Sequence, residues 1–299
     1  MRTTLKPLLR GGAAAAAIAI GLFGTSQPAH AVTDVFQELF LSLDASGSID
    51  NNEFTLYRNG YVNAFKDAAV QASIAETFAF GRGGLAIAVG QWATTAAPTL
   101  AIDWKHITDL TTDGVNGGTS LNSFITALEG MGRQGGIGTA TCIDCGMFAA
   151  ITAIDTNAFT TTRANGRVID ISTDGVGNRD LDTCPTQGNY AQCAKDQRAS
   201  AEAKNIIING LGVGESASGF LTANVATGPN GGTKAGFVET ASDFDDFQAA
   251  ITTKLVREVG PSPEDSVPGP VPVLGAAAAF GFSRKLRRRI HNTANLHQG

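Results

Sequence analysis

The sequence predicts an α/β fold in which a doubly wound, mostly parallel sheet carries helices on both faces and one antiparallel hairpin at its edge. Three observations support this prediction. Strand-like runs alternate with helical patterns between residues 35 and 259, the strand-like runs are almost continuously apolar, and two of them flank a short turn that contains proline. Such alternation is typical of βαβ units, and strands that are apolar throughout are buried on both faces. The segment, about 228 residues long, suffices for one sizeable core.

The elements are expected in a regular order along the chain. Strand-like segments lie at residues 35–43, 85–92, 99–107, 167–172, 206–211 and, as a short edge strand, 237–240. Helical spacing, with apolar side chains every three or four positions, covers residues 53–74, 120–131, 143–154, 191–205 and 243–259. Thr119 or Ser120 is the expected N-cap of the second helix. The glycine-rich stretches 111–120, 132–138 and 228–236 are expected to be loops.

The two ends of the chain differ from this body, residues 32–259. Residues 1–31 combine a basic start, an apolar run and the small-x-small motif Ala29-His30-Ala31, which is typical of a cleaved secretory signal peptide. Residues 260–299 combine a proline-rich linker, an apolar run at 271–282 and a basic cluster at 283–289. As a helix this run covers about 18 Å, less than the ~30 Å core of a bilayer. We therefore expect transient membrane contact or a short anchor at this end.

The body is acidic, although the whole chain has a formal net charge of only −5. Residues 32–259 contain 14 basic and 25 acidic residues, a net charge of −11. Because an acidic surface repels phosphate backbones, we expect no nucleic-acid partner. The body has one histidine, His106, which excludes zinc sites built on several histidines. A serine hydrolase would have to use His106 as its base, but no Gly-x-Ser-x-Gly motif is present and nothing places the strand of His106 at the loops that follow the parallel strands. We therefore expect His106 to have no catalytic role and to face solvent.

All four cysteines of the chain, Cys142, Cys145, Cys184 and Cys193, lie in the body. In an exported protein they are expected to be paired, because the compartment is oxidising. Four cysteines allow three pairings. The simplest closes the polar loop between Cys184 and Cys193 and leaves a local Cys142–Cys145 pair, but the sequence does not choose among them. Redox catalysis by the Cys-x-x-Cys motif would need a thioredoxin-like context, which the sequence lacks.

Side chains with oxygen atoms gather where strands of the body end or a helix begins. They follow the first strand, precede the helix at 143–154 and follow the strand at 167–172: Asp44, Ser46, Ser48, Thr139, Thr141 and Asp174. Ligands of doubly wound sheets bind beyond the carboxyl ends of the strands. Carboxylates combined with neutral hydroxyls suit a hard divalent cation, Mg²⁺ or Mn²⁺, with Ca²⁺ as a further option.

Three motifs together, Asp44-Ala-Ser46-Gly-Ser48, Thr141-Cys142-Ile143 and Ser172-Thr-Asp174-Gly175, resemble the von Willebrand factor type A domain with its metal-ion-dependent adhesion site. The resemblance covers about residues 34–258 and is greatest to an exported bacterial subfamily. It implies a Rossmann-like sheet. It also implies direct or water-mediated metal ligation by Asp44, Ser46, Ser48, Thr141 and Asp174, with Thr139 as the second choice for the threonine.

The same resemblance implies a function in binding and not in turnover. An acidic side chain of a protein or extracellular-matrix partner would complete the coordination of the cation. Asp144 stands where many relatives have glycine, so it would either alter the metal preference or cap the helix N-terminus. Two alternatives stay open: a hydrolase or hydrolase subunit that uses the metal or Ser46 and Ser48, and a structural surface or matrix protein whose metal only stabilises the fold.

The C-terminal segment resembles a PEP-CTERM sorting signal of bacteria. The proline motif, the short apolar stretch and the basic end occur in the order of that signal, although Val267-Pro-Gly-Pro-Val-Pro272 lacks the Pro-Glu-Pro core. The resemblance implies processing by an exosortase-type enzyme. It also implies that the mature protein lies at the cell surface or outside the cell.

Overall fold

The computed structural model describes residues 32–161, 163–229 and 234–260. The predicted signal peptide, residues 1–31, and residues 261–299 of the predicted sorting signal lie outside these ranges. Within them, no helix is both long and apolar enough to cross a membrane.

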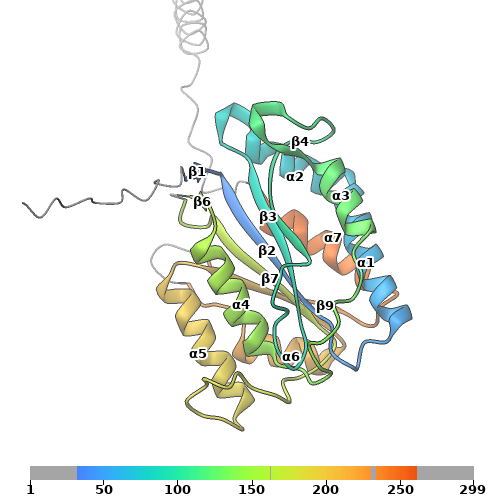
Figure 1. Cartoon of the computed structure of the whole chain (residues 1–299), viewed down its shortest axis with the longest axis vertical. Helices are drawn as coiled ribbons and strands as arrows, with labels where there is room; N and C mark the ends of the chain where they lie inside the picture. Colours follow the sequence, from blue (N-terminus) through green and yellow to red (C-terminus); the bar gives the residue numbers. More distant parts are fainter. Residues whose placement is uncertain (1–31, 162, 230–233, 261–299) are drawn as a thin grey trace, which may run out of the picture. The chain divides into compact units, whose positions relative to one another are not determined.

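A seven-stranded sheet with the order β5-β4-β3-β2-β7-β8-β9 forms the centre of the fold (Figure 1). Its strands are β2 (Gln37–Asp44), β3 (Leu85–Trp92), β4 (Ile102–Asp109), β5 (Thr119–Ser120), β7 (Arg167–Thr173), β8 (Ile207–Val213) and β9 (Val238–Ala241). Neighbouring strands run parallel except β3 and β4. The chain winds outward from β2 in both directions, so the predicted doubly wound, mostly parallel, Rossmann-like α/β fold is confirmed.

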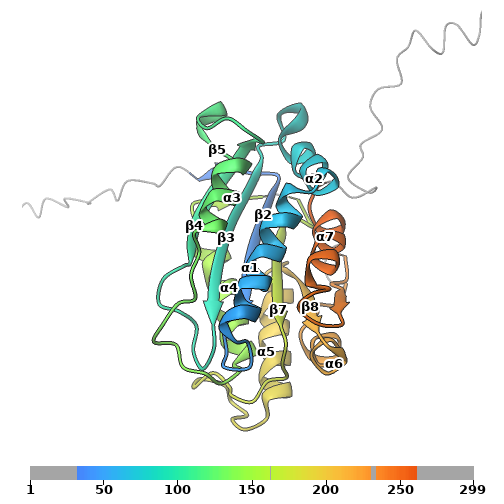
Figure 2. The same ribbon diagram turned by 90° about the vertical axis from the view of Figure 1, so that its right-hand side faces the viewer.

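Helices cover both faces of this sheet (Figure 2). One face carries α1 (Asn51–Lys66), α2 (Ala68–Phe78), α3 (Leu121–Glu129) and α7 (Phe247–Glu258). The other carries α4 (Ile143–Thr156), α5 (Tyr190–Ala203) and α6 (Glu215–Asn224). Because successive side chains of a strand point to opposite faces, Leu39 and Leu41 of β2 join the first core and Phe40 joins the second.

The hairpin of β3 and β4 is antiparallel as predicted, but it is not the edge of the sheet. The two-residue strand β5 pairs in parallel with β4 and forms that edge. A second short pair, β1 (Thr33–Asp34) with β6 (Phe159–Thr160), lies outside the main sheet. Strands of two residues carry too little periodicity to be predicted.

One predicted helix is wrong in its extent, and one helix was not predicted. The helix expected at 53–74 is divided at Asp67, whose φ of −65° and ψ of 135° leave the helical region and whose carboxylate accepts the N–H of Ala69 at 2.8 Å. The apolar spacing continues across this break and therefore hides it. Helix α6 was not predicted, because its buried face includes the small residues Ala217 and Ser218 beside Leu221.

A cluster of charged side chains lies inside the first core. The Lys254 ammonium of α7 is 2.6 Å from the Asp170 carboxylate of β7 and 2.9 Å from that of Glu258, and none of the three side chains is exposed. Burial raises the pKa of Glu258 to about 8. At pH 7 this carboxyl is therefore mostly protonated, and Lys254 and Asp170 form the buried ion pair.

Candidate metal site

Three loops meet at the carboxyl-end edge of the sheet, which is the side on which its parallel strands end. The loop after β2 carries Asp44, Ser46 and Ser48, the loop after β7 carries Asp174, and Thr141 precedes α4. The first two loops are adjacent because β2 and β7 are paired in parallel, with Leu43 opposite Ser172. The topology thus places residues more than 120 positions apart in the sequence at one edge.

Four of the predicted ligands form a continuous chain of side-chain oxygens. The Ser48 hydroxyl donates to Asp174 Oδ1 at 2.7 Å and lies 3.1 Å from the Ser46 hydroxyl. The Thr141 hydroxyl donates to the Ser46 hydroxyl at 3.3 Å. Ser46 and Thr141 are buried, whereas Ser48 is exposed and Asp174 is half-buried. The end of this row of oxygens that Ser48 and Asp174 form is therefore open to an incoming group.

Asp44 lies directly behind this chain, with no exposed surface. Its Oδ1 accepts the Ser46 backbone N–H at 2.7 Å, and its Oδ2 accepts the Thr173 hydroxyl at 2.6 Å. Burial, together with the negative charge of Asp174, raises the pKa of Asp44 to about 7, although these hydrogen bonds oppose the shift. Burial likewise raises the pKa of Asp174. Two desolvated carboxyl groups in one place are a setting that a bound cation would stabilise.

The loop that carries the serines is fastened at both ends. Asp50 caps α1 by accepting the N–H groups of Asn52 and Glu53, and Glu53 accepts the Asp50 N–H at 2.7 Å in return. The Arg133 guanidinium donates to the Ser46 carbonyl at 2.9 Å and also to the Ile49 carbonyl. The Asp-x-x-Glu pattern of the capping box was a usable sequence signal, but no pattern indicated Arg133.

Gly47 packs closely against Thr139 and does not have the positive φ that a tight turn would suggest. A Cβ at this position would lie 3.1 Å from the Thr139 side chain. The Gly47 N–H donates to the Thr139 carbonyl at 2.8 Å. Thr139, the second choice for the threonine ligand, therefore supports the serine loop through its backbone, whereas Thr141 contributes its hydroxyl to the oxygen chain.

Asn178, which the sequence did not indicate, holds Thr141 in place. Its side-chain oxygen accepts the Thr141 N–H at 2.8 Å, and its own N–H donates to the Thr141 carbonyl at 3.0 Å. Because Asn178 follows Asp174 by only four residues, this double contact ties the Thr141 loop to the Asp174 loop.

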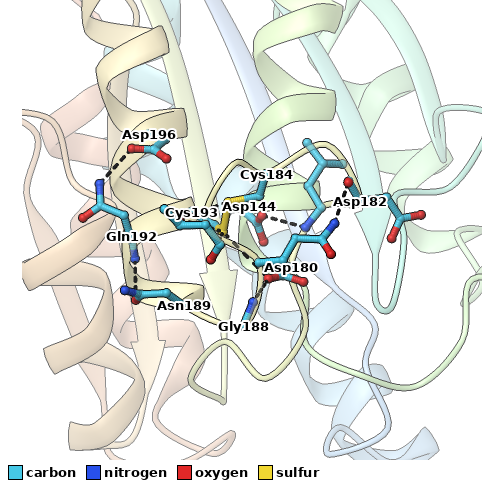
Figure 3. The surroundings of a disulfide bond; sticks show 12 residues. Asp144, Asp180, Asp182, Cys184, Gly188, Asn189, Gln192, Cys193 and Asp196 are labelled. Carbon is cyan, nitrogen blue, oxygen red and sulfur yellow. Dashed lines mark hydrogen bonds between the residues drawn. A yellow bond between two sulfur atoms is a disulfide. The ribbon is translucent and has the colours of Figure 1, made fainter.

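The cysteines form the two disulfides of the simplest predicted pairing, Cys142–Cys145 and Cys184–Cys193. The first bond directly follows Thr141. Asp144 lies beside the second bond and accepts the Leu181 N–H at 2.7 Å (Figure 3). Asp144 is buried in the first turn of α4, and its hydrogen bond to Leu181 fastens the loop after β7 to that helix. Its clusters with these cysteines are not metal sites of the zinc type, because paired sulfurs provide no thiolate.

His106 lies at the opposite edge of the sheet from Ser46 and Ser48. It pairs with Ala86, near the start of β3, whereas Asp44 pairs with Trp92 at the end of that strand. Six residues of strand separate the two levels by about 20 Å. His106 is half-buried against the Phe159 ring, with the Gly83 carbonyl in hydrogen-bonding distance, so the prediction of a solvent-facing side chain is wrong.

The donor set fits a hard divalent cation. Asp44, Ser46, Ser48, Thr141 and Asp174 offer only carboxylate and hydroxyl oxygens, the ligands that Mg²⁺, Mn²⁺ and Ca²⁺ prefer. Asp44 and Asp174 would supply negative charge, while the hydroxyls and water would supply neutral donors. Neither histidine nor thiolate contributes.

Comparison with known proteins decides the family. Residues 34–263 match the family described as "Protein of unknown function (DUF1194)". The chain belongs to the DUF1194 family. No curated protein matches this DUF1194 chain.

The DUF1194 chain is similar to several solved structures, among them the following three. Proximal thread matrix protein 1 from the mussel byssus, with a zinc-occupied MIDAS motif, is 19% identical with a TM-score of 0.46, over 76% of this chain and 46% of that one. The pilus adhesin SpaC from Lactobacillus rhamnosus GG is 11% identical, with a TM-score of 0.47, over 75% and 31%. A von Willebrand factor type A structure from Catenulispora acidiphila is 15% identical, with a TM-score of 0.44, over 76% and 43%. The chain thus spans less than half of each of these proteins.

Proposed function

We propose that this DUF1194 chain is an exported, non-enzymatic binding domain of the von Willebrand factor type A kind. In this proposal it holds Mg²⁺, or a similar divalent cation, in a metal-ion-dependent adhesion site and thereby binds an acidic group of a protein or matrix partner. The observation that carries the proposal is the unbroken chain of side-chain oxygens from Asp174 through Ser48 and Ser46 to Thr141. Three separate loops supply it, and Asp44 lies behind it.

The roles of the residues follow from their burial. Asp44, Ser46 and Thr141 are buried and would hold the cation from the protein side. Ser48 and Asp174 lie on the accessible side, where a partner would approach. The cation would supply positive charge for a partner carboxylate, which this acidic protein would otherwise repel.

A binding role suits the site better than hydrolysis does. A serine nucleophile needs an adjacent base, and His106 lies at the other edge of the sheet. Export is supported by the two disulfides, because such bonds persist in oxidising compartments. The exosortase-type processing of the C-terminal segment and the surface location remain parts of the same proposal.

A thermal-shift titration with Mg²⁺, Mn²⁺ and Ca²⁺ tests the metal. We expect at least one of these ions to raise the melting temperature in a saturable way, because binding to the folded state alone adds stability. Asp44→Asn should abolish the response while preserving the shape of the side chain. Asp245→Ala is the matched control, because Asp245 is exposed and its carboxylate makes no hydrogen bond among the described residues. An equal response in both variants would refute this site.

Retention on immobilised polyglutamate tests the partner chemistry. We expect retention in Mg²⁺ but not after removal of the metal, no retention on polyglutamine, and loss of retention in Asp44→Asn. If the metal raised the melting temperature but polyglutamate retained nothing, the metal would be structural and the adhesion proposal would fail.

A further inference from the structure

A lysine, an aspartate and a glutamate meet inside the first core. Lys254 and Glu258 lie one turn apart on α7, Asp170 contacts Lys254 from the middle of β7, and none of the three side chains is exposed. We propose that the Lys254 amine and the Asp170 carboxyl condense into an amide, with Glu258 as proton donor and acceptor. The bond would link α7 covalently to the sheet, and it does not depend on the proposed metal function.

The two reacting groups are already in contact. The Lys254 Nζ lies 2.6 Å from Asp170 Oδ1, an oxygen bonded to the carbon Cγ that the nitrogen would attack. The packed core around them keeps both side chains in this arrangement. When two groups are held in a good orientation, their contact corresponds to an effective concentration of ~10⁵ M or more. The fold therefore supplies the proximity that condensation of an amine with a carboxylic acid lacks in water.

Glu258 contacts both reacting groups. Its Oε2 lies 2.9 Å from the Lys254 Nζ and accepts the Asn209 side-chain N–H at 2.9 Å. Burial raises the pKa of Glu258 to about 8, and Asp170 adds to this shift through its charge and a hydrogen bond between the two carboxyls. At pH 7 Glu258 thus has a proton to give to Asp170, and it also touches the nitrogen from which a proton must be taken.

The unlinked arrangement is unfavourable, and condensation would relieve it. Buried charges cost so much desolvation energy that apolar residues in their place often stabilise a core at least as well. Asp170 Oδ2 and Glu258 Oε1 are also buried with no hydrogen-bond partner other than the proton that the two carboxyls share. An amide would replace two charges by one neutral group and would remove one Asp170 oxygen from the core as water. The presence of the three side chains therefore points to a reaction.

The condensation balances without any added reagent. The structure shows the state before it, in which Lys254 and Asp170 form an ion pair. A proton first moves from Nζ to Asp170, which produces a neutral amine and a neutral carboxylic acid. The nitrogen then attacks Cγ, while Glu258 gives its proton to the departing oxygen and takes one from the nitrogen. The Cγ–N bond forms, the Cγ–O bond breaks, one water molecule leaves, and Glu258 is protonated again.

Peptide mapping of the full chain after reduction and alkylation tests the proposal. Trypsin does not cleave after a lysine whose amine is acylated. We therefore expect a branched product that joins residues 168–179 to residues 235–257 and is lighter than the two peptides together by one water. Fragmentation in the mass spectrometer should place the bond between Lys254 and Asp170. Intact mass alone does not decide, because an Asp-Gly step such as Asp174-Gly175 can also lose water, but its product stays linear.

The molecule contains its own control, the pair of Lys204 and Asp155. Their charged atoms are also 2.6 Å apart, but the side chains are 40% and 38% exposed, so we expect this pair to stay unlinked in the same digest. Glu258→Gln keeps a neutral side chain of the same shape and removes the proton exchange. In a pulse–chase experiment this variant should form the link at least about a hundredfold more slowly, the usual contribution of a general acid or base.

The wild-type digest requires no variant, so its result does not depend on how a variant folds. Cooperative urea unfolding establishes that Glu258→Gln is folded before its rate is compared. The proposal is overturned if the wild type yields only the linear peptides 168–179 and 235–254, or if Lys204 and Asp155 become linked to the same extent. It is also overturned if folded Glu258→Gln forms the link as fast as the wild type does.

Discussion

Asp44 experiences opposing effects that make it the most informative single residue of the metal site. Complete burial and the nearby Asp174 favour the protonated carboxyl, whereas the donors Thr173 and Ser46 favour the carboxylate. The outcome is a pKa of about 7, which is close to physiological pH. A divalent cation would shift this balance strongly toward the carboxylate.

The metal-free protein should lose stability as pH rises from about 4 to about 7. Asp44 titrates near 3.8 in the unfolded chain and near 7 in the folded one, so between these values the folded state binds more protons. The free energy of unfolding therefore falls with rising pH, by up to about 4 kcal/mol for a shift of about three units. Urea unfolding of the wild type and Asp44→Asn at several pH values isolates this contribution, because all other groups are shared.

The pH series would contradict this prediction if the free energies of unfolding of the two proteins differed by the same amount across this range, because Asp44 would then ionise normally.

The apparent affinity of the protein for Mg²⁺ should rise about tenfold for each pH unit below pH 7, because binding of the cation then displaces one proton.

At the level of elements, the helices and strands that could be predicted from the sequence are those that depend on a continuous local pattern of residues. The strand at 167–172 and the loop after it, which carries Asp174, were predicted correctly, because an apolar run and a turn are local signals. The break at Asp67 was hidden, since Phe65, Ala68 and Ala72 keep spacings of three and four residues across it. The contacts of Asn178 and Arg133 join distant loops, and no local pattern encodes such contacts. The ligand roles of the five oxygen-bearing residues remain a prediction.

Besides the apolar contacts of Phe247, Ile251 and Leu255, the buried ammonium of Lys254 should hold helix α7 to the sheet, a contact that the sequence did not indicate. Lys254→Met would leave Asp170 as an uncompensated buried charge, so we expect a loss of about 3–5 kcal/mol in the free energy of unfolding. Lys66→Met removes a lysine from an ion pair with Glu129 whose side chains are 51% and 48% exposed. That control should change stability by less than about 1 kcal/mol.

Adding Asp170→Asn to Lys254→Met should recover part of the lost stability, because it removes the buried charge. Urea unfolding measures all three variants. A double variant as unstable as the sum of the single ones would contradict the importance of this charge.

The two disulfides should differ in what they stabilise. Replacing Cys142 and Cys145 by serine opens a very short loop and should cost about 2 kcal/mol, against about 3 kcal/mol for Cys184 and Cys193. The first bond borders Thr141, so its loss should weaken the metal-induced rise in melting temperature more than loss of the second does. Equal metal responses in the two double variants would show that the first bond does not position Thr141.

At the scale of the whole molecule, the metal loops and the C-terminal end of the described chain lie at opposite ends of the strands. The Gly260 N–H donates to the Gln37 side chain at 3.1 Å, and Gln37 in turn donates to the Glu258 carbonyl at 2.8 Å. The end of α7 and the start of β2 therefore meet at the amino-end edge. Asp44 lies at the other end of β2, whose eight residues span about 26 Å. Gly260, the last described residue, therefore lies at the end of the strands opposite the metal loops.

This separation predicts that the C-terminal segment does not influence metal binding. A protein ending at Gly260 should bind Mn²⁺ with the same affinity, within about twofold, as the chain that continues to residue 299, because the described site receives all its oxygen donors from the opposite edge. Electron paramagnetic resonance of free Mn²⁺ measures both affinities, and Asp44→Asn in the longer chain gives the background. A loss of affinity on truncation, with the melting temperature of the metal-free protein unchanged, would instead place part of the C-terminal segment at the metal site.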